Sequence, residues 1–334
     1  MPYIEFIDNK IGHKLYTLEE QYNHYDEHIN SKYFVDFFTY FDGDYKQVDA
    51  SKVDLPIKIR TETYTDYLFR LKTTTKSEKA IPVISIKRGR ENLTETDEII
   101  YIIKELQKLK EQIAIRIEGE LFHLHFKKIK ETLRASDYFF YDILEDNIDP
   151  YILDIMELEK TNSFIKILTN SPRKKDITNN NYLKSGYTDL IDNFARDDYK
   201  SYGFNGYSDY SGLKDDLPKS GGDGYSGALA VLYDHTNNKY YTITNKDTSE
   251  GISGYGFVIE EIQKEEMVKK LRLNDCLAYN YLKENNFPFD KTGNYATWNF
   301  ITLLRVLSEM KIVYRWLSVD YFIINIVFKK PLII

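Results

Sequence analysis

The stretch IAIRIEGE, residues 113–120, alternates isoleucines with Ala114, Arg116 and Glu118. This alternation predicts a β-strand, because successive side chains of a strand point to opposite faces of a sheet. One face of the strand is apolar, and the other ends in an arginine and a glutamate. What covers that charged face decides which fold the chain adopts.

Strand and helix patterns alternate on both sides of this stretch. Strands are expected at 81–90, 112–118, 137–144 and 163–170, with helices at 94–110, 122–134 and 150–160. Strands separated by helices of this length pair in parallel through crossover connections. The pattern alone is compatible with an open doubly wound sheet and with a closed barrel.

The four strands share the same division into an apolar and a polar face. Apolar positions suited to packing under helices are Ile84, Ile86, Ile113, Ile115, Ile117, Phe139, Tyr141, Ile143, Ile165 and Ile167. Polar positions of opposite parity are Ser85, Lys87, Arg116, Glu118, Asp142 and Lys166. Strands of an open parallel sheet are apolar on both faces, whereas a barrel has an outer face under helices and an inner face.

The charged face therefore favours an α/β fold of the TIM-like (β/α) barrel type, complete or irregular. Lys87, Arg116, Asp142 and Lys166 are expected to share its interior, where charges must pair. Ligand sites of such barrels lie at the carboxyl ends of the strands. A purely structural charge network and a ligand-facing site both explain these residues.

The expected organisation is a single barrel-like domain over 1–334. Residues 1–31 are interpreted as an N-terminal extension, 32–328 as the barrel, and 173–226 as a long polar loop insertion with one helix near 182–195. The remaining expected elements are a strand at 32–41, a helix at 62–74, a strand–turn–strand around 236–238, helices at 259–272, 274–285 and 296–310, and a last strand within 312–328.

Composition restricts the functional classes. The chain of 334 residues is 42% hydrophobic and 29% charged, which is typical of a soluble globular protein, and its net charge of -7 argues against a broad grip on nucleic acid. The single cysteine, Cys276, excludes an internal disulfide and a cysteine-rich zinc site, which predicts a cytoplasmic location. No signal-peptide pattern is present, and the apolar run YFIINIVF (321–328) is too short to span a membrane.

Three stretches resemble a known family. AIPVISIKR (80–88), IAIRIEGE (113–120) and SYGFNGYSDYSGLK (201–214) followed by GALAVLYDHTNNKYYTI (227–243) are similar to segments of the "beta protein" family, named from a phage T4 member and found in bacteria, phages and mobile elements. The resemblance implies a barrel-like α/β fold and a phage, mobile-element or anti-phage defence context. It implies no particular reaction.

Two further motifs are candidate sites. In GFNGYSDYSGL (203–213), Asp209 is interpreted either as a ligand contact with Tyr207 or Tyr210 stacking, or as a turn cap with the tyrosines packed on the rim. The pair His123 and His125 falls at a helix start, which does not favour metal ligation. We therefore expect no metal and no cofactor.

Three functional hypotheses follow. The first is a protein of phage–host conflict that binds a partner protein, a nucleic acid end or a phosphate-containing ligand. The second is a barrel enzyme acting on a phosphate ester or nucleic acid, with Glu118 and Asp142 as catalytic acid or base. The candidate ligand-binding residues are Lys87, Arg88, Arg116, Lys166, Asp209 and Tyr210. Basic side chains outnumber acidic ones on the polar face of the strands, which favours an anionic ligand. The third is a structural protein, favoured if large side chains fill the interior. None requires a membrane.

Overall fold

A computed structural model describes residues 1–6, 10–11, 14–37, 39, 54–90, 93–171, 173–177, 179–182, 184–189, 191, 195–213, 227–285, 295–314 and 321–327. Its centre is a curled parallel sheet, which confirms the expected α/β architecture. The strands lie in the order β10-β8-β7-β6-β5-β4-β1, and β13 pairs in parallel with both β1 and β10. Their bounds are β1 Pro2–Phe6, β4 Tyr33–Phe37, β5 Ala80–Ile86, β6 Ala114–Glu118, β7 Tyr138–Asp142, β8 Ile165–Thr169, β10 Gly206–Asp209 and β13 Tyr321–Val327.

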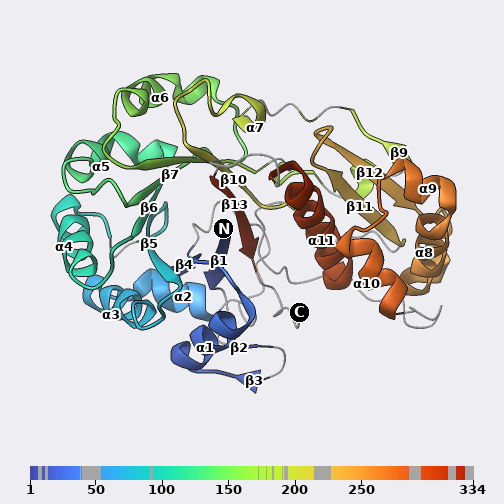
Figure 1. Cartoon of the computed structure of the whole chain (residues 1–334), viewed down its shortest axis with the longest axis horizontal. Coiled ribbons are helices and arrows are strands. Elements are labelled where there is room, and N and C mark those ends of the chain that lie inside the picture. Colours follow the sequence, from blue (N-terminus) through green and yellow to red (C-terminus); the bar gives the residue numbers. More distant parts are fainter. Residues whose placement is uncertain are drawn as a thin grey trace.

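Helices cover the outer face of this sheet, as Figure 1 shows for α3 to α6. The helices between the sheet strands are α1 Leu18–His28, α2 Asp54–Thr61, α3 Tyr64–Thr74, α4 Thr96–Gln107, α5 Phe122–Ile129, α6 Ile152–Glu159 and α7 Ala195–Asp198. Both α1 and α3 begin at a threonine capping box, formed by Thr17 with Glu20 and by Thr63 with Asp66. Such a box satisfies backbone N–H groups that a first helical turn leaves without partners.

The outer face carries the parity expected for three strands. Ile84 and Ile86 of β5, Ile115 and Ile117 of β6, and Phe139 and Tyr141 of β7 belong to the large core shared with the helices. The opposite face is filled near the amino ends of the strands by a separate cluster. Its buried members are Tyr3, Phe34, Ile81, Val83, Ala114, Tyr138, Phe140 and Ile167.

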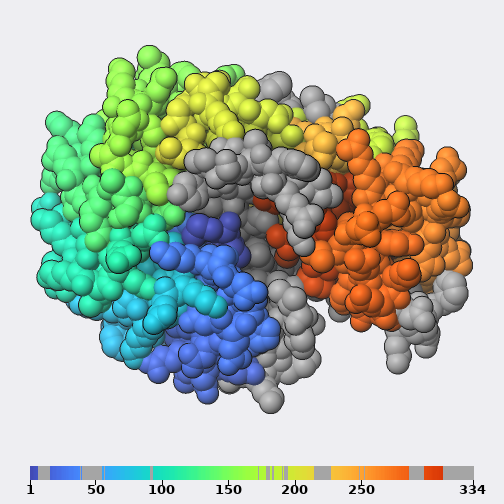
Figure 2. All heavy atoms as spheres, in the orientation of Figure 1, coloured from blue at the N-terminus to red at the C-terminus, as the bar shows by residue number. Residues whose placement is uncertain are grey.

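A second, smaller part follows β10 in the chain. Its antiparallel sheet has the order β11-β12-β9, with β9 Gly186–Tyr187, β11 Leu229–Asp234 and β12 Lys239–Thr244. Its helices are α8 Tyr255–Gln263, α9 Glu265–Lys270, α10 Leu277–Asn285 and α11 Tyr295–Tyr314. These helices form the right-hand part of the molecule in Figure 2, coloured orange to red. A short antiparallel pair of strands, β2 Lys10–Ile11 and β3 Lys14–Leu15, lies near the amino end of the chain.

Three expectations need correction. The stretch 1–31 is no separate extension, because β1 lies in the curled sheet beside β4. The helix expected at 182–195 is wrong, because Gly186–Tyr187 pairs with β12 as a strand. The loop expected at 173–226 is interrupted by β10, a strand of the curled sheet, although residues 214–226 lie outside the described part of the chain.

Candidate functional site

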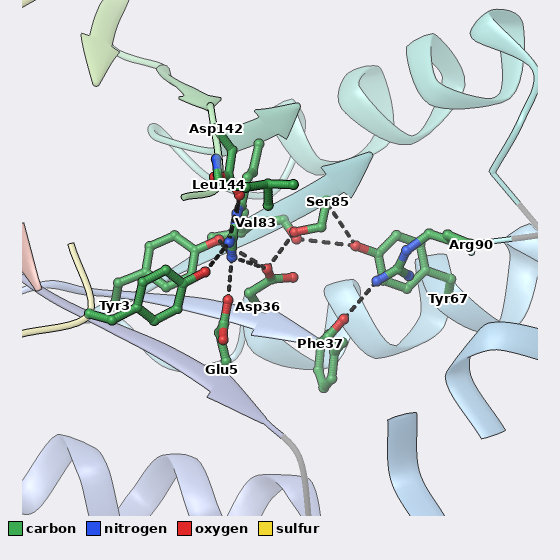
Figure 3. A network of polar contacts seen from close by, with 12 residues as sticks. Tyr3, Glu5, Asp36, Phe37, Tyr67, Val83, Ser85, Arg90, Asp142 and Leu144 are labelled. Atoms are coloured by element: carbon green, nitrogen blue, oxygen red, sulfur yellow. Dashed lines mark hydrogen bonds and ion pairs between the residues drawn. The ribbon is translucent and has the colours of Figure 1, made fainter. Parts of the chain in front are cut away.

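Arg116 of β6 lies among carboxylates from three other strands, namely Glu5, Asp36 and Asp142. Figure 3 labels these three carboxylates, which point toward one another from their strands. Arg116 Nε donates to Asp142 Oδ2 at 2.8 Å, and its Nη2 lies 2.7 Å from the same oxygen. Its Nη1 donates to Glu5 and lies 3.4 Å from Asp36 Oδ2. The side chains of all four residues have no exposed surface.

Hydroxyl groups complete this cluster, which we call the Arg116 network. Arg116 Nη2 donates to Tyr210 Oη at 2.6 Å, and Tyr3 Oη donates to Asp36 Oδ2 at 3.0 Å. Ser85 of the neighbouring strand also donates to Asp36. Every nitrogen of the guanidinium therefore has an acceptor within the protein.

The electrostatics of the network favour a permanently charged arginine. Burial lowers the pKa of Arg116, but the charge of Asp142 and the groups of Tyr210, Tyr3 and Glu5 raise it by more, so the net direction is upward. Burial and the nearby Asp36 carboxylate raise the pKa of Tyr3. The network thus carries one cation against three carboxylates and holds them without contact with solvent.

This arrangement suits a structural role for Arg116 better than ligand binding. A ligand anion would have to displace an existing carboxylate, and the surrounding negative charge opposes its approach. Below the network, the inner face is packed with aromatic side chains, among them Phe34, Tyr138 and Phe140. Large side chains therefore fill the interior near the amino ends of the strands. This filling favours the hypothesis of a structural protein for that half of the interior.

A second polar group lies at the carboxyl ends of β5 and β6, and we call it the rim cluster: Lys87, Arg88, Glu118 and Glu120. Glu118 Oε2 accepts a hydrogen bond from the Arg88 backbone N–H at 2.8 Å and lies 3.5 Å from Arg88 Nε. Arg88 Nη1 lies 3.3 Å from Glu120, and its side chain remains 30% exposed. Within the rim cluster, solvent therefore reaches Arg88 and Glu120, whereas Lys87 and Glu118 are buried.

Glu118 has a perturbed acidity in this environment. Burial raises its pKa, the charge of Lys87 lowers it, and Asp142 on the adjacent strand raises it further, with a net upward shift. Glu118 and Asp142 are register partners in the β6–β7 pair. A buried carboxyl with a raised pKa beside a second carboxylate is suited to proton transfer.

Lys166 does not join the other basic residues. Its parity is opposite to the one expected, because Ile165 and Ile167 pack with the inner aromatic cluster. Its Nζ donates to the carbonyl of Leu158 at 2.9 Å, in the last turn of α6, where a helix leaves carbonyl groups without intrahelical partners. Lys166 therefore does not lie on the inner polar face, where it was expected with Lys87 and Arg116.

The structure separates Asp209 from Tyr210. Asp209 is buried at the end of β10 and accepts from the Ser211 N–H at 2.6 Å, so it caps a turn as one of the two interpretations expected. Tyr207 packs into the outer core. Tyr210 lies on the inner face with Arg116, which gives it a place in the network rather than a stacking surface for a ligand.

The histidine pair behaves as the helix interpretation expected. His123 lies 2.7 Å from Asp154 of α6, and His125 lies 2.9 Å from Thr96 of α4, so they serve different neighbours. Within the part of the chain that is described, no three His, Cys, Asp or Glu side chains are grouped to hold a metal ion. No helix in that part is long and apolar enough to cross a membrane.

Sequence reasoning missed Glu5 and Asp36, two of the three carboxylates around Arg116. Both stand in short runs with the alternation used for the other strands, PYIEF and YFVDF, at the carboxyl end of the strand. They are register partners in the β1–β4 pair. Applying the same parity rule to these runs would have found them.

Three comparisons with known proteins find no relative of this chain. A scan of protein-family models finds no match to the chain, and searches of curated proteins and of solved structures find none either.

Proposed function

We propose that the protein binds a phosphate-containing ligand at the carboxyl end of the curled sheet, against the rim cluster. The observation that carries the proposal is a buried Glu118 held beside Lys87 and a partly exposed Arg88. Arginine and lysine are the side chains that phosphate groups use most as partners. Arg88 is the member that a ligand can reach without displacing the Arg116 network.

The proposal includes the finer fold expectation. We take the pairing of β13 with both β1 and β10 as the closure of an irregular TIM-like barrel, with the second antiparallel sheet and α8 to α11 inserted before the last strand. In such barrels the loops after the strands build the ligand site. In the rim cluster, Lys87 and Arg88 follow β5, Glu118 ends β6 and Glu120 follows it, in agreement with that rule.

Charge decides where on the inner face an anion can bind. Near Arg116 the carboxylates of Glu5, Asp36 and Asp142 exceed the single cation, so an added phosphate is repelled. At the rim, Lys87 and Arg88 accompany Glu118 and Glu120, and Arg90 follows two residues later. A ligand anion therefore fits the rim and not the interior.

A second candidate function is an enzyme that hydrolyses a phosphate ester, favoured by the raised pKa of Glu118 and its register pairing with Asp142. Glu118 would give or take the proton, and Arg88 would hold the phosphate. General acid–base catalysis contributes on the order of a hundredfold to ten-thousandfold. The partner-binding role in a phage or defence context stays a prediction from the resemblance.

The binding test uses isothermal titration of the full chain with inorganic phosphate and with short single-stranded oligonucleotides. We expect Arg88→Gln to weaken binding about tenfold, the loss of one charge-assisted hydrogen bond. Lys104→Gln, an exposed change on α4, is the matched control and should bind as the unchanged protein does. Equal affinities for all three proteins would refute the proposed site.

The catalytic test is a panel of phosphomonoesters, phosphodiesters and nucleic acids, with and without divalent metals. If any of these compounds is hydrolysed, Glu118→Gln should abolish turnover while ligand binding persists. The amide keeps the shape of the carboxyl group but cannot act as an acid or a base near neutral pH. Hydrolysis at the original rate by Glu118→Gln would exclude Glu118 as the acid or base.

A further inference from the structure

Arg90 is a second arginine at the carboxyl end of β5, and the established contacts of its side chain are few. Its Nη2 donates to the carbonyl of Phe37, the last residue of β4, at 2.6 Å. The guanidinium carbon lies 4.1 Å from the centre of the Tyr67 ring. Figure 3 shows Arg90 beside Tyr67, with the bond to Phe37 below.

These two contacts hold the guanidinium in one place. The Tyr67 ring of α3 covers one face of the guanidinium, and Nη2 donates a hydrogen bond to the backbone of β4. Tyr67 is itself fixed, because its hydroxyl donates to the Val83 carbonyl at 3.2 Å and accepts from the Ser85 N–H at 3.1 Å. Side chains positioned in this way lose little freedom when a ligand binds.

The remaining donors of Arg90 have no acceptor among the residues that the structure describes. Only 3% of the residue is exposed, yet neither Nε nor Nη1 has a hydrogen-bond partner within the described part of the chain. These two nitrogens carry most of the N–H groups of a guanidinium. Leaving buried donors of a charged group unsatisfied is unfavourable, so such groups are normally paired with protein, water or a ligand.

We propose that Arg90 forms an oxyanion subsite for a second anionic group of the ligand. This inference rests on the proposed function, because the rim cluster would take the first phosphate. An oxyanion supplies several acceptor oxygens and one negative charge, which is what Nε and Nη1 lack. The substrate class is therefore a ligand with two neighbouring anionic groups, such as a diphosphate.

The acidic neighbours of Arg90 do not supply this partner. The charge of Asp36 also reaches Tyr67, but Asp36 Oδ2 is bound by Tyr3 and Ser85 and lies beside Arg116. No ion pair between Arg90 and a carboxylate is found within the described residues.

The test compares inorganic phosphate with pyrophosphate by isothermal titration of the full chain. The unchanged protein should bind pyrophosphate more tightly than phosphate. Arg90→Lys, which keeps the charge and a donor for Phe37, should weaken pyrophosphate about tenfold and phosphate by much less. Arg88→Gln should weaken both ligands.

Folding is checked by far-ultraviolet circular dichroism and thermal unfolding of each variant, with Lys104→Gln as the matched control. If Arg90→Lys binds pyrophosphate as the unchanged protein does, water alone satisfies Arg90 and the subsite is wrong, while the rim site stands. If the unchanged protein binds neither phosphate nor pyrophosphate, the subsite and the rim site are both wrong.

Discussion

The Arg116 guanidinium is buried with three carboxylates, and each of its nitrogens donates to one of them or to a tyrosine. A buried ion pair of this kind costs desolvation energy on both sides, so its net contribution to stability is small. Removal of one partner is different, because the others then keep their charges without compensation. The importance of Arg116 is therefore best measured by what its loss leaves behind.

Arg116→Met should lower the free energy of unfolding at pH 7 by about 3–5 kcal/mol, the usual cost of breaking a buried pair. Urea unfolding at pH 7 measures this loss. Lys128→Met, which breaks an exposed pair with Asp97, is the control and should cost no more than about 1 kcal/mol. If Arg116→Met lowered the free energy of unfolding by less than Lys128→Met does, the stabilising role assigned to the Arg116 network would be contradicted.

Asp209 provides a pH prediction at the same scale. Burial raises its pKa from 3.8 to about 6, while the Ser211 N–H and the charge of Arg196 lower it. A folded pKa above the unfolded one means that the folded protein binds this proton more tightly. The stabilisation is complete below pH 3.8 and is lost as the pH rises through about 6.

Asp209→Asn removes that dependence because the amide does not titrate in this range. The stability of the unchanged protein relative to Asp209→Asn should fall by about 2 kcal/mol between pH 4 and pH 7, since it declines at about 1.36 kcal/mol for each pH unit between the two pKa values. Urea midpoints across this range give the difference. Asp189→Asn, at an exposed position, is the control. An Asp209→Asn difference that stays flat from pH 4 to pH 7 would show that folding does not raise the pKa of Asp209.

Strands are the elements that the sequence predicts best here, because period-two alternation survives wherever one face meets helices. The alternation of β5, β6 and β7 predicts their outer faces correctly. In β8 it fails, since the long stem of Lys166 is accommodated outside, and the amine finds a helix carbonyl there. Binary patterning cannot distinguish a lysine inside a barrel from one that reaches a helix end.

The short strands were harder to predict for a different reason. β10 covers only Gly206–Asp209, within a stretch rich in glycine and tyrosine, and β9 covers Gly186–Tyr187. Both are stabilised by pairing with strands distant in sequence, which no local pattern reveals. The candidate site shares this limit. Glu118 and Lys87 follow from alternation, whereas the acceptors around Arg116 come from β1, β4 and β7 and from Tyr210, the residue after β10.

The turn after β10 gives a prediction for an element. Gly212 has a φ of +74°, and a Cβ there would lie 2.3 Å from Tyr233 Cβ in β11. Gly212→Ala therefore adds a steric clash with a neighbouring strand to the backbone strain of a left-handed conformation. Gly186, at φ +129° with open space around it, isolates the strain alone.

We expect Gly212→Ala to lower the free energy of unfolding by more than Gly186→Ala, which should cost about 1–3 kcal/mol. Chemical denaturation of the two variants provides the comparison. Gly212→Ala should also weaken the bond from Tyr240 Oη to the Gly212 carbonyl, now 2.8 Å. Equal costs for the two variants would show that β11 can move away from the turn without penalty.

At the scale of the whole molecule, the curled sheet and the second sheet share a hydrophobic core. Leu229, Tyr233 and Tyr240 of the second sheet, together with Leu303 and Val306 of α11, belong to the same buried cluster as Tyr207 of β10. A further cluster lies within the second part alone, around Trp298 and Tyr255. The shared core implies that the two parts unfold as one cooperative unit rather than as separate domains.

Val306→Ala tests this cooperativity. Val306 is fully buried in the shared cluster, so its truncation should cost about 2 kcal/mol through lost burial and a residual cavity. Hydrogen–deuterium exchange in low urea then measures protection of peptides covering Ala114–Glu118 and Leu229–Asp234, one from each sheet. In a single cooperative unit both peptides lose protection by the same factor. Leu124→Ala, whose side chain lies on an exposed face of α5, should change neither. Loss of protection confined to the second sheet would show that the long segment between β10 and β13 folds as a domain of its own.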